Sequence, residues 1–264
     1  MMLLLGIEVR RCAARRLVRA LVGLALVGCA LCLLLSYRAA AHDAARLPFQ
    51  LAELHQPESG ESVLGAAAFF LIIGAAVGGA SMIGAEWRAG TFTTLLTWAP
   101  QRRRVAVAKL AACGLVAAAV AMVLEALFIA SLVPAALGPG TTEGVDADWV
   151  WSLTGAGVRV AAITALVAVF MASVAMIGRS TAAALGFAFA YLLLVENLVR
   201  AWKPWSGRYL LGENGARFIT GAELEGLPFE TSTVAAGITL GAYAALAVAL
   251  AVATFWRRDL AAAP

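Results

Sequence analysis

The sequence predicts an all-α membrane protein, a polytopic bundle of six transmembrane helices that forms one domain over residues 1–264. The chain is 62% hydrophobic and 14% charged, and its mean hydropathy is +0.87. Soluble domains average about 45–50% apolar and about 25% charged residues. Six stretches have the roughly 20 mostly apolar residues that a helix needs to cross a bilayer. They are residues 17–36, 63–84, 105–133, 154–177, 181–200 and 234–256.

The basic residues and the tryptophans predict that both the N- and the C-terminus are cytoplasmic. With the N-terminus inside, thirteen of the twenty Lys and Arg residues fall on the inner side and seven on the outer side. Cytoplasmic loops carry such an excess. The tryptophans fall at the two expected membrane boundaries, where amphipathic rings gather. The basic balance therefore indicates topology and contact with membrane lipid, and it does not favour a nucleic-acid partner.

The first sixteen residues, MMLLLGIEVRRCAARR, predict an interfacial helix over residues 1–16 on the inner leaflet. At about 100° per residue, Leu3 and Ile7 gather on one side, and Glu8 and Arg11 on the other. The alternative is a basic tail that only fixes topology.

The first span also has features of a secretory leader, because an apolar run follows arginines and precedes RAAAHD. The apolar run is longer than a usual leader core, which favours an uncleaved first helix.

The spans carry glycine pairs and one proline that bear on packing. Gly74-x-x-x-Gly78 and Gly237-x-x-x-Gly241 predict close helix contacts, within one subunit or, alternatively, between two. The third stretch is long, so we expect it to tilt or to break before Pro134.

The outer segments differ in length and character. Residues 134–153 form a short acidic loop, and residues 37–62 form a polar one. The longest, 201–233, predicts an extracytoplasmic re-entrant segment or a surface-lying hairpin, with Ser206 and Gly212 as caps of a short helix.

Cysteine and histidine spacing favours neither disulfides nor a metal site. The four cysteines lie in apolar or inner segments, so no disulfide framework is expected. Cys29-x-x-Cys32 could be a metal or redox pair, but two small hydrophobic residues within a membrane helix are the favoured reading. His42 and His55 are too far apart in one loop to indicate metal ligands.

The inner stretch GAEWRAGTFTTLLTWAPQRRRVAVAK, residues 84–109, interrupts the apolar sequence. Gly90 and Thr91 predict a helix start, since a Thr oxygen can accept an unpaired backbone N–H. Phe92, Leu95 and Leu96 then share one face. Pro100 stops the helix, because the residue before a proline is driven out of helical geometry. A loop that is basic for topology alone would explain the arginines but not the other residues.

These residues resemble the cytoplasmic signature of ABC (ATP-binding-cassette) type-2 transporter permeases, especially those of high-GC actinobacteria. The whole layout matches, with a basic N-terminal helix, six spans and a larger outer segment between spans five and six. The residues that carry the resemblance are Glu86, Arg88, Gly90, Thr91, Phe92, Leu95, Leu96, Pro100, Arg102, Arg103, Arg104 and Lys109.

The resemblance implies the permease subunit of an ATP-driven exporter in a bacterial cell membrane. Residues 85–104 would be a coupling segment that docks on a separate ATPase subunit, residues 1–16 would pack beside it, and residues 201–233 would be an outer lid. The implied partners are two ABC ATPase subunits and a second permease copy or a sister permease.

A nucleotide-binding loop is absent from the sequence. Such a loop needs G-x-x-x-x-G-K-[ST], and the only two lysines, Lys109 and Lys203, are followed by Leu and Pro. We therefore expect no cofactor and no enzyme activity in this chain, with ATP and Mg²⁺ on the partner ATPase. The alternatives are a channel or scaffold that needs no ATPase and an intramembrane enzyme, although no H-E-x-x-H motif is present.

Four charged residues fall inside or at the edge of the predicted spans, where charge is costly. Glu196 and Arg200 are four residues apart and can pair on one helix face. The four residues form either a polar patch on a translocation path or interhelical pairs that orient the bundle. They are Glu125, Arg159, Glu196 and Arg200.

Overall fold

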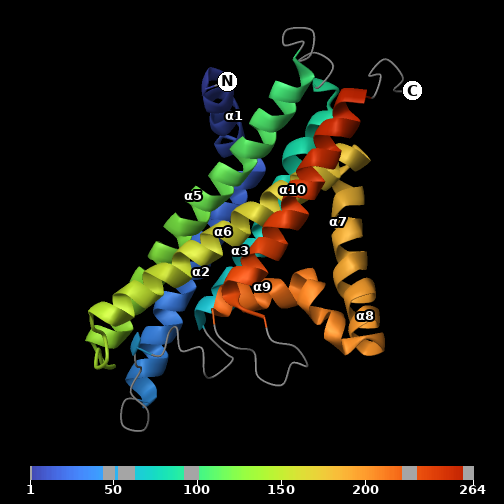
Figure 1. Cartoon of the computed structure of the whole chain (residues 1–264). Helices are drawn as coiled ribbons and strands as arrows, with labels where there is room; N and C mark the ends of the chain where they lie inside the picture. Colours follow the sequence, from blue (N-terminus) through green and yellow to red (C-terminus); the bar gives the residue numbers. More distant parts are fainter. Residues whose placement is uncertain (1, 44–50, 53–62, 92–100, 222–230, 258–264) are drawn as a thin grey trace.

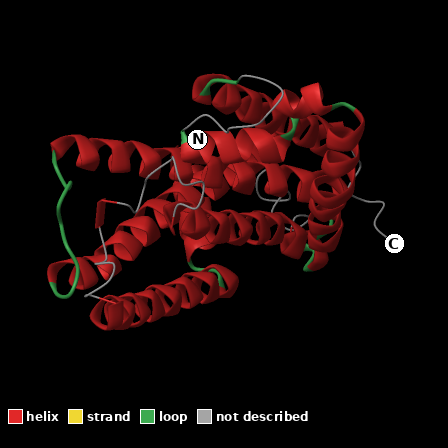
Figure 2. Ribbon diagram, turned by 90° about the horizontal axis from the view of Figure 1, so that it is seen from below, coloured by secondary structure: helices red, strands yellow, loops and turns green. Residues whose placement is uncertain are grey.

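A computed structural model confirms the all-α prediction, and the elements that it describes are helices (Figures 1 and 2). The structure describes residues 2–43, 51–52, 63–91, 101–221 and 231–257. Six helical stretches within them are long and apolar enough to cross a membrane, in agreement with the six predicted spans.

The helices follow the predicted order along the chain. A short helix, α1, precedes the first spanning helix, α2, and a π-helical turn, η3, joins α7 to α8 within the fifth span. The helices are α1 (Met2–Ala13), α2 (Arg16–Asp43), α3 (Val63–Arg88), α5 (Arg102–Leu137), α6 (Ala147–Gly178), α7 (Thr181–Ala190), η3 (Tyr191–Val195), α8 (Glu196–Trp202), η4 (Pro204–Tyr209), α9 (Leu211–Thr220) and α10 (Thr233–Arg257).

One end of the bundle gathers α1, the start of α5 and the end of α10 (top of Figure 1). We call it the inner end, because it carries the segments that the basic residues predict to be cytoplasmic. Cations lie over tryptophan rings there. The Arg103 guanidinium is 4.0 Å from the ring centroid of Trp256, and that of Arg179 is 4.9 Å from Trp87. Such contacts suit a boundary where one face of the ring is apolar and the other polar.

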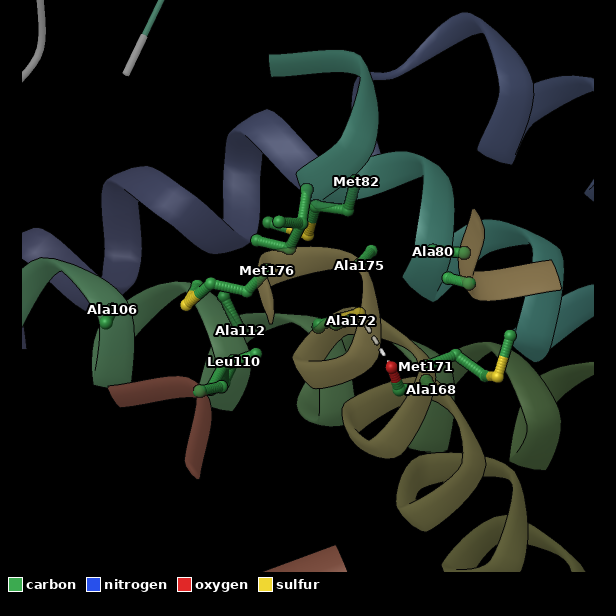
Figure 3. Close-up of a cluster of buried hydrophobic side chains, with 14 of the residues drawn as sticks. Ala80, Met82, Ala106, Leu110, Ala112, Ala168, Met171, Ala172, Ala175 and Met176 are labelled. Atoms are coloured by element: carbon green, nitrogen blue, oxygen red, sulfur yellow. Dashed lines mark hydrogen bonds between the residues drawn. The ribbon is translucent and has the colours of Figure 1, made fainter. Parts of the chain in front are cut away.

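The centre of the bundle is α6, which packs against α3, α5 and α10. More than half of its apolar stretch is buried, whereas the corresponding stretch of α2 is not buried at all. Small side chains let these helices approach closely. Figure 3 shows alanines of α6, including Ala168, Ala172 and Ala175, with methionines around them.

Close approach is made at one predicted glycine, Gly237, and at Gly79, which was not predicted. A Cβ on Gly79 of α3 would collide with the backbone carbonyl of Ala168 of α6. Gly74 and Gly78 face no atom of the described residues within 4 Å of such a Cβ. In the last span, Gly237 does make a contact, because a Cβ there would lie 2.7 Å from the Phe218 ring of α9. The rotation of each helix about its own axis decides which glycine contacts another helix, and the spacing of the glycines alone does not give that rotation.

The ends of α5 and α6 extend beyond the predicted spans. The third span does not break before Pro134, because α5 continues through it to Leu137. The fourth begins at Ala147, where Asp146 accepts a hydrogen bond from the Trp149 backbone N–H at 2.7 Å. This N-cap starts the helix several residues before the apolar stretch.

The fifth span contains a π-helical turn over Tyr191–Val195. An inserted residue of this kind leaves backbone carbonyls without their usual partners. The Asn197 amide donates to two of them, the carbonyls of Leu192 at 3.2 Å and Leu193 at 3.0 Å.

The outer segment after the fifth span turns back against the bundle, where α9 lies across α6 and α10 (Figure 1). The predicted caps are wrong. The α9 N-cap is Leu210, which makes no side-chain cap bond, and the C-cap is Gly221 in the left-handed region at φ +70°. The Tyr243 hydroxyl donates to the Tyr209 carbonyl at 3.0 Å and ties α10 to the start of this segment.

Candidate functional site: a buried charge network at the inner end

Lys109 is the centre of a charge network at the inner end. It lies on α5, two turns after the helix start, and its side chain is 0% exposed. Its ammonium is 2.9 Å from Oε2 of Glu8 on α1 and 2.7 Å from Oε2 of Glu86 on α3. Three helices that are distant in sequence therefore meet at one cation.

Arginines from the N-terminal region complete the network. The Arg15 guanidinium is 3.0 Å from Oε1 of Glu86 and also donates to the Ser81 carbonyl at 3.0 Å. Arg11 lies 3.1 Å from Oε1 of Glu8 and 3.6 Å from Oε1 of Glu86. The network thus has three cations for two carboxylates. Each of these two carboxylates is shared by at least two cations, so neither Glu8 nor Glu86 is left without a counter-charge.

The orientation of α1 explains how these groups come together. Glu8 and Cys12 are buried, while Met2, Leu3 and Ile7 are largely exposed. The side of α1 that carries Leu5, Glu8, Val9 and Cys12 therefore faces the protein, and the side with Leu3 and Ile7 is free to contact lipid. This fits an interfacial helix whose Glu8 side meets α5.

Apolar packing continues the contact between α1 and α5. Cys12 and Cys113 lie one helical turn beyond Glu8 and Lys109, and both are buried in the central cluster. The Cys113 thiol donates to the Ala168 carbonyl of α6 at 3.8 Å. The network thus stands at the edge of the bundle core.

Gly90 and Thr91 form the end of α3. Gly90 has φ +66°, and the Thr91 hydroxyl donates to the Glu86 carbonyl at 3.2 Å. The Thr91 hydroxyl was expected to cap a following helix, whereas the described contact satisfies a carbonyl at the end of α3. Phe92, Leu95, Leu96 and Pro100 lie outside the described residues.

The remaining basic residues of the predicted coupling segment border this site. Arg88 ends α3 and is exposed, and Arg102, Arg103 and Arg104 begin α5. Glu86 and Lys109 belong to the residues that carry the resemblance, and the structure pairs Glu86 with Arg11 and Arg15 of the N-terminal region. The sequence did not predict Glu8 as a partner of Lys109. The signal was present, since Glu8, Arg11 and Arg15 share one face of a helical projection.

The four charges near the outer side are not brought together. Glu196 accepts a hydrogen bond from the Gly212 backbone N–H at 2.8 Å, while Arg200 pairs with Glu213 of α9 at 2.8 Å. Both residues therefore hold α9 against α8. They do not form the Glu196–Arg200 pair that their spacing of four residues allows. Glu125 and Arg159 are in separate places on α5 and α6 and make no ion pair with a described residue.

Buried polar contacts also fix α9. The Asn214 amide is buried and donates to the carbonyls of Arg208 at 2.9 Å and Leu210 at 2.7 Å. These two bonds tie the first turn of α9 to the segment before it, and the N-cap residue itself makes no side-chain cap bond. No group of three or more His, Cys, Asp or Glu side chains able to hold a metal occurs within the residues described.

The fold and the network define a multi-pass membrane protein whose N-terminal helix is bound to two spans at one end of the bundle. The chain belongs to a family of ABC-2 transporter membrane proteins, since the model for the ABC-2 family transporter protein matches residues 4–195. Membership makes it a permease component of an ABC transporter. A search of curated proteins gave no match.

Proposed function

We propose that the chain is the permease subunit of an ATP-driven exporter in a bacterial cell membrane and that it couples to separate ATPase subunits. The observation that carries this proposal is the buried network of Glu8, Glu86 and Lys109. The network lies at both ends of the inner segment 85–104, because Glu86 is near the end of α3 and Lys109 is near the start of α5. Family membership supports the same assignment.

The network attaches both ends of the inner segment to the helix bundle. A buried ion pair that loses one partner costs about 3–5 kcal/mol, so α1, α3 and α5 resist separation at this end. A movement of the segment would then reach three helices together. A soluble ATPase that pushes on residues 92–100 would move the ends of α3 and α5 as one body.

The test uses the ATPase encoded beside this chain and measures two quantities, capture of the ATPase by the permease and ATP hydrolysis in lipid vesicles. Leu95→Arg should prevent capture, because it places a charge on the predicted docking face. Glu86→Gln should keep capture and lower the permease-dependent stimulation of hydrolysis, because the network loses a charge that binds α3 to α5.

Thr93→Ala on the opposite predicted face is the matched control and should change neither quantity. Correct insertion of each variant is checked by size-exclusion chromatography. Equal capture and equal stimulation for Leu95→Arg, Glu86→Gln and Thr93→Ala would contradict coupling through residues 85–104 and favour a channel or scaffold.

A further inference from the structure

Glu125 is a buried acid without a partner in the middle of α5. The residue is 3% exposed, and neither carboxyl oxygen has a hydrogen-bond partner among the described residues. It precedes the helix end at Leu137 by twelve residues, about 18 Å along the axis at 1.5 Å per residue. The acid therefore lies well inside the apolar part of the bundle.

The facing helix, α6, offers it backbone and no charge. A Cβ on Gly157 would lie 3.5 Å from Oε2 of Glu125, so α6 meets the carboxyl at a residue without a side chain. Arg159 is two residues further and about 200° around the helix. Its guanidinium lies near two other glycines, Gly155 of α6 and Gly221 after α9. A Cβ on Gly155 would be 3.7 Å from one terminal nitrogen, and a Cβ on Gly221 would be 2.8 Å from the other.

Apart from Arg159 of α6, the described helices that pack on α5 carry their charged residues towards the helix ends. Lys109 is about 24 Å away along α5 by the helical rise. The titratable groups on these elements are Glu8, Arg10, Arg11 and Cys12 of α1; Arg16, Arg19, Cys29, Cys32, Tyr37, Arg38, His42 and Asp43 of α2; Glu86 and Arg88 of α3; Asp148, Arg159 of α6; and Tyr243 and Arg257 of α10.

An isolated carboxylate is costly in such apolar surroundings, so they favour the neutral, protonated form of Glu125. A positive charge brought from outside would restore the carboxylate by pairing with it. From this geometry we propose that Glu125 is a proton-exchanging site for a lipophilic, monovalent organic cation, an inference that rests on the permease function proposed above and names its substrate class.

The exchange balances in atoms and charge. The O–H bond of the Glu125 carboxyl breaks, the proton passes to water, and the carboxylate stays paired with the incoming cation. A single carboxylate matches one positive charge. A divalent metal ion needs several oxygen ligands, and the described residues do not gather them. The apolar residues of α5 and α6 around the site require the body of the cation to be apolar too.

The experiment labels the full-length chain in lipid vesicles with dicyclohexylcarbodiimide, which adds to protonated carboxyls in apolar surroundings. Mass spectrometry of the peptides locates the adduct. We expect labelling of Glu125 at neutral pH, less labelling as the pH rises, and protection by tetraphenylphosphonium. Triphenylphosphine oxide, a neutral compound of similar shape, should protect much less.

Two variants make the result specific. Glu125→Gln should lose the adduct on this peptide and retain the fold, because an amide replaces a neutral acid of the same shape. Gly157→Ala keeps the acid and adds a methyl group beside it, so labelling should persist while protection by tetraphenylphosphonium weakens several-fold. Glu196→Gln, which changes a carboxylate that already has a partner, should leave both labelling and protection of Glu125 unchanged.

Absence of the adduct at Glu125, or protection by the neutral compound equal to that by the cation, would overturn the proposal. Labelling needs neither an ATPase nor transport. A chain that exchanges its proton for the cation but does not stimulate an ATPase would therefore contradict only the proposed coupling.

Discussion

Lys109 is a fully buried lysine whose charge is balanced by carboxylates of two other helices. Glu8 and Glu86 both lie within 3 Å of its ammonium. Such a cluster adds little net stability compared with apolar packing, but removal of one member leaves a buried charge uncompensated. At the scale of single residues, the inner end is therefore sensitive to any change of charge at this position.

Lys109→Met should lower the free energy of unfolding by about 3–5 kcal/mol, because Glu8 loses its best-buried counter-charge. Thermal unfolding in detergent measures this. Lys203→Met is the control, since that ammonium is exposed and lies 4.7 Å from the Trp202 ring centroid, a contact worth about 0.5–1 kcal/mol at exposed sites. Adding Glu8→Gln to Lys109→Met should recover part of the loss. Equal destabilisation by the two lysine changes would contradict the network's energetic role.

The sequence predicted part of this network. The resemblance placed residues 1–16 beside the coupling segment that contains Glu86, and the structure pairs Glu86 with Arg11 and Arg15. The Glu8–Lys109 pair was not predicted, because the helical projection shows which residues share a face but not which helix that face meets. The sequence placed Glu125 within a span, whereas its lack of a partner depends on the rotation of α6, which the sequence does not give.

At the scale of elements, the contact between α3 and α6 is the closest in the bundle core. The α3 backbone at Gly79 meets the α6 backbone at Ala168 with no room for a side chain. Gly78, one residue earlier, has free space among the described residues. The two glycines differ in surroundings and share the same helix.

Gly79→Ala should destabilise the fold relative to Gly78→Ala by about 1–3 kcal/mol, the usual cost of overpacking. Both changes improve helix propensity by a similar amount, about 1 kcal/mol, so their difference isolates the clash. Unfolding temperatures of the two variants in the same detergent give the comparison. If they were equal, α3 and α6 would not approach at Gly79.

Hydropathy predicted which segments span, and capping decided where they end. The N-cap at Asp146 extends α6 well beyond its apolar stretch. The π-turn at Tyr191–Val195 has no signature in composition, because it is a change of hydrogen-bond register. The start of α9 was misplaced because its N-cap, Leu210, makes no side-chain cap bond, so no capping residue marks this start in the sequence.

At the scale of the whole molecule, much apolar surface faces outwards. The apolar stretch of α2 is unburied, and large side chains such as Leu24, Leu31 and Leu35 are exposed. Lipid covers such surfaces in a membrane, and a second copy can cover part of them.

We predict that the chain purifies with its ATPase as an assembly of two permease chains and two ATPase subunits. Six spans supply half of the twelve that the resembling transporters use. Native mass spectrometry gives the composition, and co-expression with any neighbouring permease gene separates a homodimer from a heterodimer. A stable complex with one permease chain would contradict the prediction.

The pairing of Glu8 with Lys109 has a consequence for the order of biosynthesis. The two residues are 101 positions apart, so at about 5–20 residues per second the ribosome makes Lys109 about 5–20 s after Glu8. Until then Glu8 lacks its buried counter-charge, and α1 can be tied to the earlier spans through the pairing of Arg11 with Glu86. Because α1 is made before α5 but needs Lys109 to balance Glu8, insertion of the third span completes the inner end.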